Sequence, residues 1–285
     1  MISVIIPTYN RSESLRLCLT ALKNQTHRDF EVIVIDDGSD DIDVVKEFGH
    51  RYIWHPHDGF GLSRSRNEGT RLAKGELFHF IDSDIMLAPT ALENAWKLYQ
   101  DNPNRAIGGY YRYLPGMVIT PEDVTERWED VWNYELPAKE VGQTLMPEGD
   151  DVREAWFRMG MIGQNPFDFE EEVLWSPFVL LGGNMVIPRH IFQQTDGFDE
   201  HFNTYGGEDA EMSLAIISRG YGISYSRRVA GCHIAHKKEA SATQGDGGEK
   251  EHRRYIATKY PYFLDADGNP RMEVWGLPVQ RRDYE

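Results

Sequence analysis

Cysteine is scarce in this chain, because Cys18 and Cys232 are the only two among its 285 residues. A pair so widely separated forms neither a zinc-binding spacing nor a disulfide framework, which favours a reducing compartment. Long apolar runs are also missing, since none approaches the roughly 20 residues that span a bilayer. The first residues enter a strand pattern directly, so we expect no signal peptide. These absences predict a cytoplasmic protein without a transmembrane segment, and peripheral attachment to the inner face of the membrane stays open.

Basic residues are in the minority, with 30 Lys and Arg against 46 Asp and Glu and a net charge of −16. Neutralising the phosphates of a nucleic acid requires clustered Lys and Arg, so this balance argues against nucleic acid as the partner. It leaves room for a local patch that binds a nucleotide. The length suits one large α/β domain or two small ones. Because we find no repeat and no linker, we predict a single domain over residues 1–285, with its two halves meeting near residue 105.

Strand and helix patterns alternate through the first hundred residues. Strand patterns, including short continuous apolar runs typical of buried parallel strands, occur at residues 3–7, 31–35, 51–55 and 76–84. Helix patterns separate them at about residues 15–22, 41–48 and 62–73. This alternation predicts an α/β fold with a doubly wound, mainly parallel sheet flanked by helices.

The second half of the chain is less regular. We expect a helix at 89–100, a strand at 106–113, a strand at 182–187, a helix at 208–219 and a strand at 222–226. Between about 114 and 175 the pattern degrades into Pro, Gly, acids and Trp. A substrate-facing insertion or lid and a helical excursion that packs its aromatics into the core fit that stretch equally well. Residues 237–251 are polar and rich in Gly, and we predict that they are mobile.

Two carboxylates end the strand at 76–84, in the run Asp82-Ser83-Asp84. Ligands of open α/β sheets bind at the carboxyl edge of the strands. Paired carboxylates at that edge suggest a divalent cation that carries a phosphorylated substrate. Because the chain turns there, one carboxylate can bind the metal directly while the other holds water or a sugar hydroxyl. Solvated acids are common in loops, so this pair alone is a weak signal.

Polar residues near the other strand ends are candidates for a nucleotide site. Asp36 and Asp37 could receive the base and ribose, although an Asx-type turn alone would explain them. Arg64 and Arg66, with Asn67, precede Asp82 by one helix and could reach phosphate or nucleobase. A solvated helix face is the alternative for these three residues, and for Arg64 we favour it.

A helix that opens with Gly206-Gly207-Glu208-Asp209 supplies a candidate general base. Acids in the first turn suit the helix dipole, which explains them as capping residues and is also expected to keep Asp209 ionised for work as a base. His233 and His236 lie just beyond the last expected strand. Surface or core histidines are common, but two of them three residues apart suit a neutral metal ligand.

Five motifs fall in the order seen in family 2 glycosyltransferases, which this chain therefore resembles. They are SVIIPTYN at 3–10, EVIVIDDGS at 31–39, LSRSRNEG at 62–69, GELFHFIDSD at 75–84 and GGEDAE at 206–211. The resemblance implies the GT-A fold, a nucleotide diphosphate sugar as donor, usually a UDP-sugar, and Mn²⁺ or Mg²⁺ as cofactor. It makes residues 1–105 the nucleotide-sugar-binding half and residues 106–285 the acceptor-binding half.

The same resemblance implies roles for individual residues. Asp209 would deprotonate the acceptor hydroxyl and Glu208 would orient donor or acceptor sugar. Asp84 would bind the metal, completed by His236 in preference to His233. Asp82 would contact ribose or, through water, the metal. Donor contacts would come from these residues: Pro7, Tyr9, Asp36, Asp37, Arg66, Asp82, Ser83, Gly183 and Asn184.

The stretches at 182–187, 195–200 and 205–211 also resemble a region shared by β-1,4-galactosyltransferases, chondroitin-type polymerases and polypeptide N-acetylgalactosaminyltransferases. Tyr205 stands where those relatives carry Trp ahead of the glycines. The sequence thus predicts transfer of a hexose or N-acetylhexosamine to a hydroxyl acceptor with inversion, and leaves open whether the acceptor is a carbohydrate, a lipid-linked group or a peptide. A retaining transferase, a sugar nucleotidyltransferase and a non-catalytic carbohydrate-binding protein are the alternatives.

Overall fold

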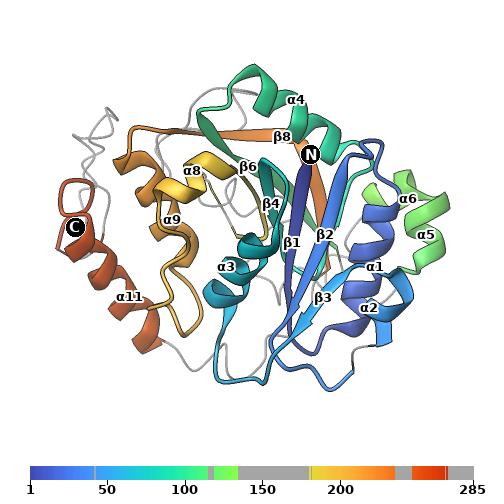
Figure 1. Ribbon diagram of the computed structural model, residues 1–285, viewed down its shortest axis with the longest axis horizontal. Helices are drawn as coiled ribbons and strands as arrows, with labels where there is room; N and C mark the ends of the chain where they lie inside the picture. Colours follow the sequence, from blue (N-terminus) through green and yellow to red (C-terminus); the bar gives the residue numbers. More distant parts are fainter. Residues whose placement is uncertain are drawn as a thin grey trace, which may run out of the picture.

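An eight-stranded sheet forms the centre of the computed structural model (Figure 1). Its strands lie in the order β3-β2-β1-β4-β7-β6-β8-β5. The structure describes residues 1–41, 43–114, 119–133, 180, 182–234, 246–266 and 268. Within these ranges no helix is long and apolar enough to cross a membrane.

The first four strands are parallel to one another, as the alternating pattern predicts. They are β1 (Ile2–Thr8), β2 (Phe30–Asp36), β3 (Arg51–Trp54) and β4 (Leu77–Ile81). The helices between them are α1 (Ser12–Lys23), α2 (Asp43–Phe48) and α3 (Leu62–Leu72). Parallel strands share one carboxyl edge, so the residues that follow β1, β2 and β4 meet there.

The other half of the sheet is mixed. Strand β7 (Asn184–Pro188) runs antiparallel to both β4 and β6 (Arg105–Leu114), whereas β6 and β8 (Gly222–Ile234) are parallel. A short strand, β5 (Ile85–Leu87), pairs antiparallel with β8. The prediction of a mainly parallel sheet therefore holds for the first half, while β7 joins the second half to it in the opposite direction.

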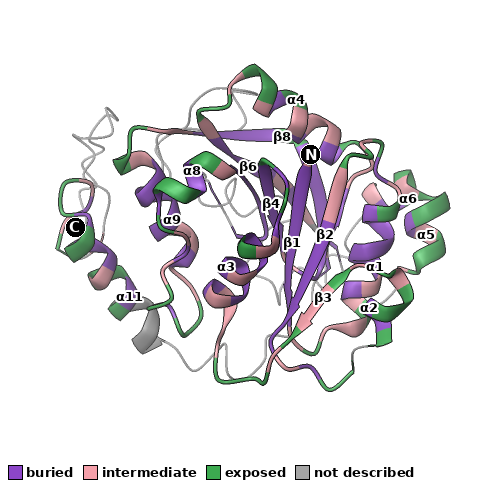
Figure 2. Ribbon diagram, viewed as in Figure 1, coloured by how far each residue is buried: buried purple, intermediate pink, exposed green. Residues whose placement is uncertain are grey.

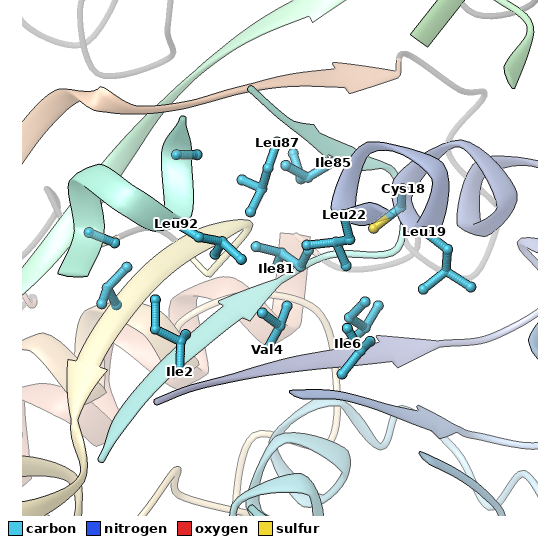
Figure 3. Close-up of a cluster of buried hydrophobic side chains, with 14 of the residues drawn as sticks. Ile2, Val4, Ile6, Cys18, Leu19, Leu22, Ile81, Ile85, Leu87 and Leu92 are labelled. Atoms are coloured by element: carbon cyan, nitrogen blue, oxygen red, sulfur yellow. The ribbon is translucent and has the colours of Figure 1, made fainter. Parts of the chain in front are cut away.

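Helices cover both faces of the sheet because the strand side chains alternate between them. On one face, Ile2, Val4 and Ile6 of β1 pack under α1 and α4 (Ala91–Asp101), as Figure 3 shows for Cys18, Leu22 and Leu92. On the other face, Ile5, Ile33, Ile35, Phe78 and Phe80 pack against α3, α8 (Arg189–Gln194) and α9 (Glu208–Ser218). Figure 2 shows the result, a buried sheet with helices exposed on their outer sides. Each buried aliphatic or aromatic side chain contributes about 1.5–3 kcal/mol to stability.

Several elements differ from the sequence-based expectation. Strand β5 and helix α8 were not predicted, and β8 extends to Ile234 rather than ending at Ser226. Strand β8 is longer because a bulge between Gly109 and Tyr110 of β6 lets the pairing resume after Ser226. Helix α11 (Asp246–Lys259) takes up the last residues of the segment expected to be mobile, and residues 235–245 lie outside the described part.

The irregular stretch at 114–175 is described only at residue 114 and over residues 119–133. That part forms α5 (Pro121–Glu126) and α6 (Trp128–Trp132). Trp128 and Trp132 pack against a cluster that includes Leu17 and Ala21 of α1. The described part thus agrees with a helical excursion that packs its aromatics onto the core.

Candidate active site

The Asp82-Ser83-Asp84 turn lies at the carboxyl edge of the sheet, between β4 and β5. The backbone N–H of Asp82 donates to the Gly183 carbonyl at 3.3 Å, and the N–H of Ile85 donates back to the Asp82 carbonyl at 3.0 Å. These bonds fix the turn against the start of β7. Ser83 and Asp84 are each only 6% exposed. Asp84 is therefore buried, whereas the Asp82 side chain is 37% exposed, and both follow β4 at the sheet edge where the strand pattern places them.

His233 lies beside Asp84, inside strand β8 rather than beyond it as the sequence analysis expected. The antiparallel pairing of β5 with β8 sets Ile85 opposite His233, and the Ile234 N–H donates to the Asp84 carbonyl at 2.9 Å. The His233 Nε2 and Asp84 Oδ1 atoms are 3.6 Å apart. His236, the histidine preferred from the sequence, lies outside the described residues. The structure thus brings His233 close to Asp84, and the preference for His236 stays a prediction.

The donor set around Asp84 suits a divalent cation. Carboxylate oxygen and neutral imidazole nitrogen are ligands that Mn²⁺ accepts, and Mg²⁺ prefers oxygen and water. No group of three or more His, Cys, Asp and Glu in the described residues could hold a metal ion. Asp84 and His233 would therefore supply two ligands, and oxygens of a diphosphate and water would complete the usual six.

Arg66 joins the turn after β4 to the start of α9. Its Nη2 donates to Asp82 Oδ1 and its Nη1 to Glu208 Oε1, both at 3.1 Å. The guanidinium is 1% exposed and lies 5.1 Å from the centre of the Phe198 ring. A Cβ on Gly182 would come within 2.4 Å of Arg66 Nη2, so a side chain there would displace the guanidinium. In this structure both terminal nitrogens of Arg66 are paired with protein carboxylates, and its expected contact with phosphate or base stays a prediction.

Helix α9 presents Glu208 and Asp209 from its first turn. Two left-handed glycines, Gly206 with φ 89° and Gly207 with φ 102°, lead into the helix. Glu208 is 6% exposed, and its Oε2 atom has no hydrogen-bond partner among the described residues. Asp209 accepts from the Ala210 N–H at 2.7 Å and from the Gly182 N–H at 3.5 Å.

Burial and the neighbouring Glu208 carboxylate raise the pKa of Asp209 to about 7. The helix N-terminus alone predicts an ionised Asp209, and the raised pKa shows that this prediction is wrong between pH 3.8 and about 7. The backbone donors lower the pKa, but loss of hydration and repulsion by Glu208 outweigh them. The pKa of Asp82 is likewise raised by burial and by Asp84, against the opposing charge of Arg66.

Aromatic and charged side chains gather where β1 and β2 end. Tyr9 stacks on His57 with ring centres 4.1 Å apart and planes 9° apart. His57 Nδ1 lies 3.0 Å from Asp37 Oδ2, and Arg64 donates to Asp37 Oδ1 at 2.8 Å. Arg64 is therefore paired rather than simply solvated. The group offers a flat stacking surface beside a carboxylate, which suits a nucleobase or ribose.

Two candidates, Asp36 and Asn184, are committed to the framework. The Asp36 carboxylate accepts from the Tyr52 hydroxyl and the Ser39 N–H, at 2.8 Å and 2.7 Å. Asn184 is fully buried, where its amide bonds His79 and two carbonyls of β6 and β8. These bonds use the Asn184 amide within the framework, and its expected contact with the donor sugar stays a prediction.

Two further candidates, Gly183 and Pro7, lie near the site in different ways. Gly183 stays at the site, because a Cβ there would lie 3.3 Å from Asp82 Oδ2. Pro7 is a buried residue of β1, paired with Ile35 and two residues before Tyr9.

Sequence reasoning missed His57 and the partners of Arg66. His57 follows β3 in a loop without a periodic pattern, so no local signal marks it. The contacts of Arg66 join residues 16 and 142 positions apart in the chain. The one local signal is the alternation of Ser and Arg in LSRSRNEG, where the structure buries Ser63, Ser65 and Arg66 on α3.

Two family models match consecutive parts of this chain. The model of glycosyl transferase family 2 matches residues 3–149, and that of the N-terminal domain of galactosyltransferase matches residues 178–237. Validoxylamine A glucosyltransferase of Streptomyces hygroscopicus subsp. jinggangensis is 29% identical over 253 residues, which cover 85% of this chain and 57% of that protein. The chain spans well under two-thirds of the length of such curated relatives.

Solved structures confirm the expected GT-A fold. TarS of S. aureus in complex with UDP-GlcNAc superposes with a TM-score of 0.60 at 18% identity, covering 90% of this chain and 66% of that one. A mannosyltransferase from Pyrobaculum calidifontis in complex with GDP-Man and Mn²⁺ gives 0.54 at 18% identity, covering 84% and 58%. These likenesses establish the fold, and the family model covers more than half of the sequence. The chain belongs to glycosyl transferase family 2.

Proposed function

We propose that this chain is a metal-dependent glycosyltransferase that moves a hexose or N-acetylhexosamine from a UDP-sugar to a hydroxyl acceptor, with inversion. Family membership supports the reaction class. The UDP-GlcNAc held by TarS and the GDP-Man and Mn²⁺ held by the mannosyltransferase support a nucleotide-sugar donor and a divalent ion. The match of residues 178–237 to the galactosyltransferase model supports a hexose-type sugar.

One observation carries the proposal: Arg66 holds Asp82 and Glu208 at 3.1 Å each. It thereby joins the acids at the nucleotide edge of the sheet to the helix that bears Asp209. Asp209 has a pKa of about 7, so a large part of it is ionised at neutral pH and it is still basic enough to take a proton. A carboxylate with these properties beside a metal-binding turn suits deprotonation of an acceptor hydroxyl.

In the proposed reaction, the acceptor hydroxyl donates a hydrogen bond to Asp209 and gives up its proton to that carboxylate. The acceptor oxygen forms a bond to the anomeric carbon, and the bond from that carbon to the diphosphate oxygen breaks on the opposite face. UDP leaves with the bonding electron pair, and Asp209 returns its proton to solvent. Glu208 orients a sugar hydroxyl through Oε2, whose lone pairs have no partner among the described residues.

The nucleotide end of the donor would lie against Tyr9 and Asp37, with His57 stacked on Tyr9 and with Pro7 two residues before it. Asp84 and His233 would hold Mn²⁺ or Mg²⁺, and Asp82 would contact it through water or bind the ribose. A divalent ion bound there neutralises charge on the diphosphate leaving group. Ser83 and Gly183 border this part of the site.

The test is replacement of the base by its neutral isostere, Asp209→Asn. Sugar transfer from a panel of UDP-sugars is measured as UDP release in the presence of Mn²⁺, and we expect its rate to fall by about 10²–10⁴-fold in the variant. UDP should still raise the melting temperature of the variant, because donor binding is kept. The matched control is Asp196→Asn, a left-handed position with a 91% exposed side chain that suits Asn. Transfer near the parental rate in Asp209→Asn would refute the base, and a product that keeps the donor configuration would refute inversion.

A further inference from the structure

The geometry points to His252 of α11 as a positioning residue that holds the loop before Asp209 in the form needed for transfer. This inference rests on the proposed function, because it assigns His252 an effect on the proposed base. Helix α11 lies alongside α9 (Figure 1), and Ile256, Ala257 and Tyr260 pack against Leu214 and Ala215.

The His252 ring bridges two polar atoms of the loop that leads into α9. Its Nδ1 lies 2.6 Å from the Gly206 carbonyl oxygen and its Nε2 lies 3.1 Å from the Thr204 hydroxyl. A carbonyl only accepts, so Nδ1 carries a proton, and in the neutral ring Nε2 then accepts from Thr204. His252 is 5% exposed, so its ring is buried against the loop.

The loop needs such a support because its own residues do not specify its shape. Gly206 and Gly207 both have left-handed backbone angles, and glycine has no side chain to restrict them. The backbone at Gly207 also packs closely against its neighbours, since a Cβ there would lie 2.9 Å from the Phe202 ring and 3.3 Å from His252 Cβ. Phe202 meets the His252 ring edge to face, with centres 4.9 Å apart. The His252 imidazole therefore supports the loop in two ways, by a hydrogen bond to the Gly206 carbonyl and by packing against Phe202.

Helix α11 also holds α9 on the other side of Asp209. Glu211 is 1% exposed and accepts from Lys259 and from the Tyr260 hydroxyl, the latter at 2.6 Å. Contacts to Gly206 and Glu211 thus bracket Asp209, three residues before it and two after it. A shift of about 1 Å in a reacting group can lower a rate by about 10²-fold. Loss of the His252 contact should therefore act on turnover rather than on donor binding, which involves Tyr9 and Asp37.

Replacement of His252 by Ala, Asn and Gln tests the inference. Asn places an amide N–H where Nδ1 stands and can still donate to Gly206, whereas Gln reaches the position of Nε2 and Ala keeps neither contact. We expect kcat to fall by about 10–100-fold in Ala and Gln and to recover to within about fivefold in Asn, with the Kd for UDP unchanged. The control is His201→Ala, which removes a ring stacked on Tyr255 of α11 at 4.0 Å but leaves the loop contacts in place.

Amide hydrogen exchange of the peptide over residues 204–214 gives a readout that does not depend on transfer. It should quicken in Ala and Gln but not in Asn, with the peptide of β1 unchanged. Equal kcat in folded parent and Ala proteins, or equal loss in Asn and Gln, would overturn the inference. If Asp209→Asn stays active while amide exchange quickens in the Ala and Gln variants of His252 but not in the Asn variant, the proposed base is refuted. The inference that His252 supports the loop then still stands.

Discussion

Removal of the buried guanidinium of Arg66 is the sharpest test of the site as a structural unit. Arg66→Met keeps a flexible stem over Phe198 and removes the charge shared by Asp82 and Glu208. The Glu208 side chain is 8% exposed and has no solvent to replace the lost partner, whereas the Asp82 side chain is 37% exposed and stays partly hydrated. Most of the penalty therefore falls on Glu208.

Breaking a buried ion pair by removing one partner costs about 3–5 kcal/mol, because a charge is left uncompensated. We expect the free energy of unfolding of Arg66→Met to fall by an amount in this range. Glu208 accounts for most of that loss, because solvent screens the charge of Asp82. For a chain of this size each kcal/mol lowers the melting temperature by roughly 2–4 °C, so a fall of roughly 6–20 °C should be seen. Urea unfolding followed by circular dichroism measures the free energy directly.

Arg64→Met is the matched control, because the Arg64 side chain is 38% exposed and pairs with Asp37 near the surface. It should cost about 1 kcal/mol or less. Adding Glu208→Gln to Arg66→Met removes the stranded charge and should restore about 1–3 kcal/mol. An Arg66→Met protein that unfolds within about 1 kcal/mol of the parent, or a double variant that restores nothing, would show that the bridge does not hold the two carboxylates as argued.

Further predictions concern titration and metal binding. Asp209 has a pKa of about 7 and, as the proposed base, would act when ionised, so kcat/KM should rise with pH and level off above about 7 in the parent. A flat profile from acid to neutral pH would contradict the proposed base. The pKa of Asp209 in the folded protein exceeds the ordinary value of 3.8, so the free energy of unfolding falls as the pH rises from 3.8 to about 7. Asp209→Asn should therefore melt at a higher temperature than the parent at alkaline pH, and the difference should vanish near pH 3.8. Equal melting temperatures of the two proteins at alkaline pH and near pH 3.8 would refute the argument that burial raises this pKa. His233→Ala should weaken Mn²⁺ binding in calorimetry by at least about tenfold, whereas the exposed His190→Ala should not, and unchanged affinity would remove His233 from the metal site.

Local patterns predicted much of the nucleotide-binding half. The apolar runs of β1, β2 and β4 and the helices between them follow from periodicity alone, and the position of Asp82 and Asp84 follows from the rule that parallel strands share a carboxyl edge. The order of five motifs indicated the family, which the family model confirms. Each of these signals lies within a short stretch of chain, where residue type and spacing carry the information.

Tertiary contacts decided the rest of the site. His233 reaches Asp84 because β8 continues past a bulge and pairs with β5, and the sequence of one strand does not specify its register with a distant strand. The contacts of the Asn184 amide with His79, Tyr110 and Val229 likewise depend on strands that lie far apart in the chain.

The chain by itself determined the family, the alternation of strands and helices in the first half and the residue types of the chemistry. Only the fold shows that buried Arg66 bridges two carboxylates, and that burial beside Glu208 raises the pKa of Asp209. The physical reason is that charge energies depend on solvent access and on neighbours brought from far along the chain. Sequence names the carboxylates, and only their packing sets how strongly each one holds its proton.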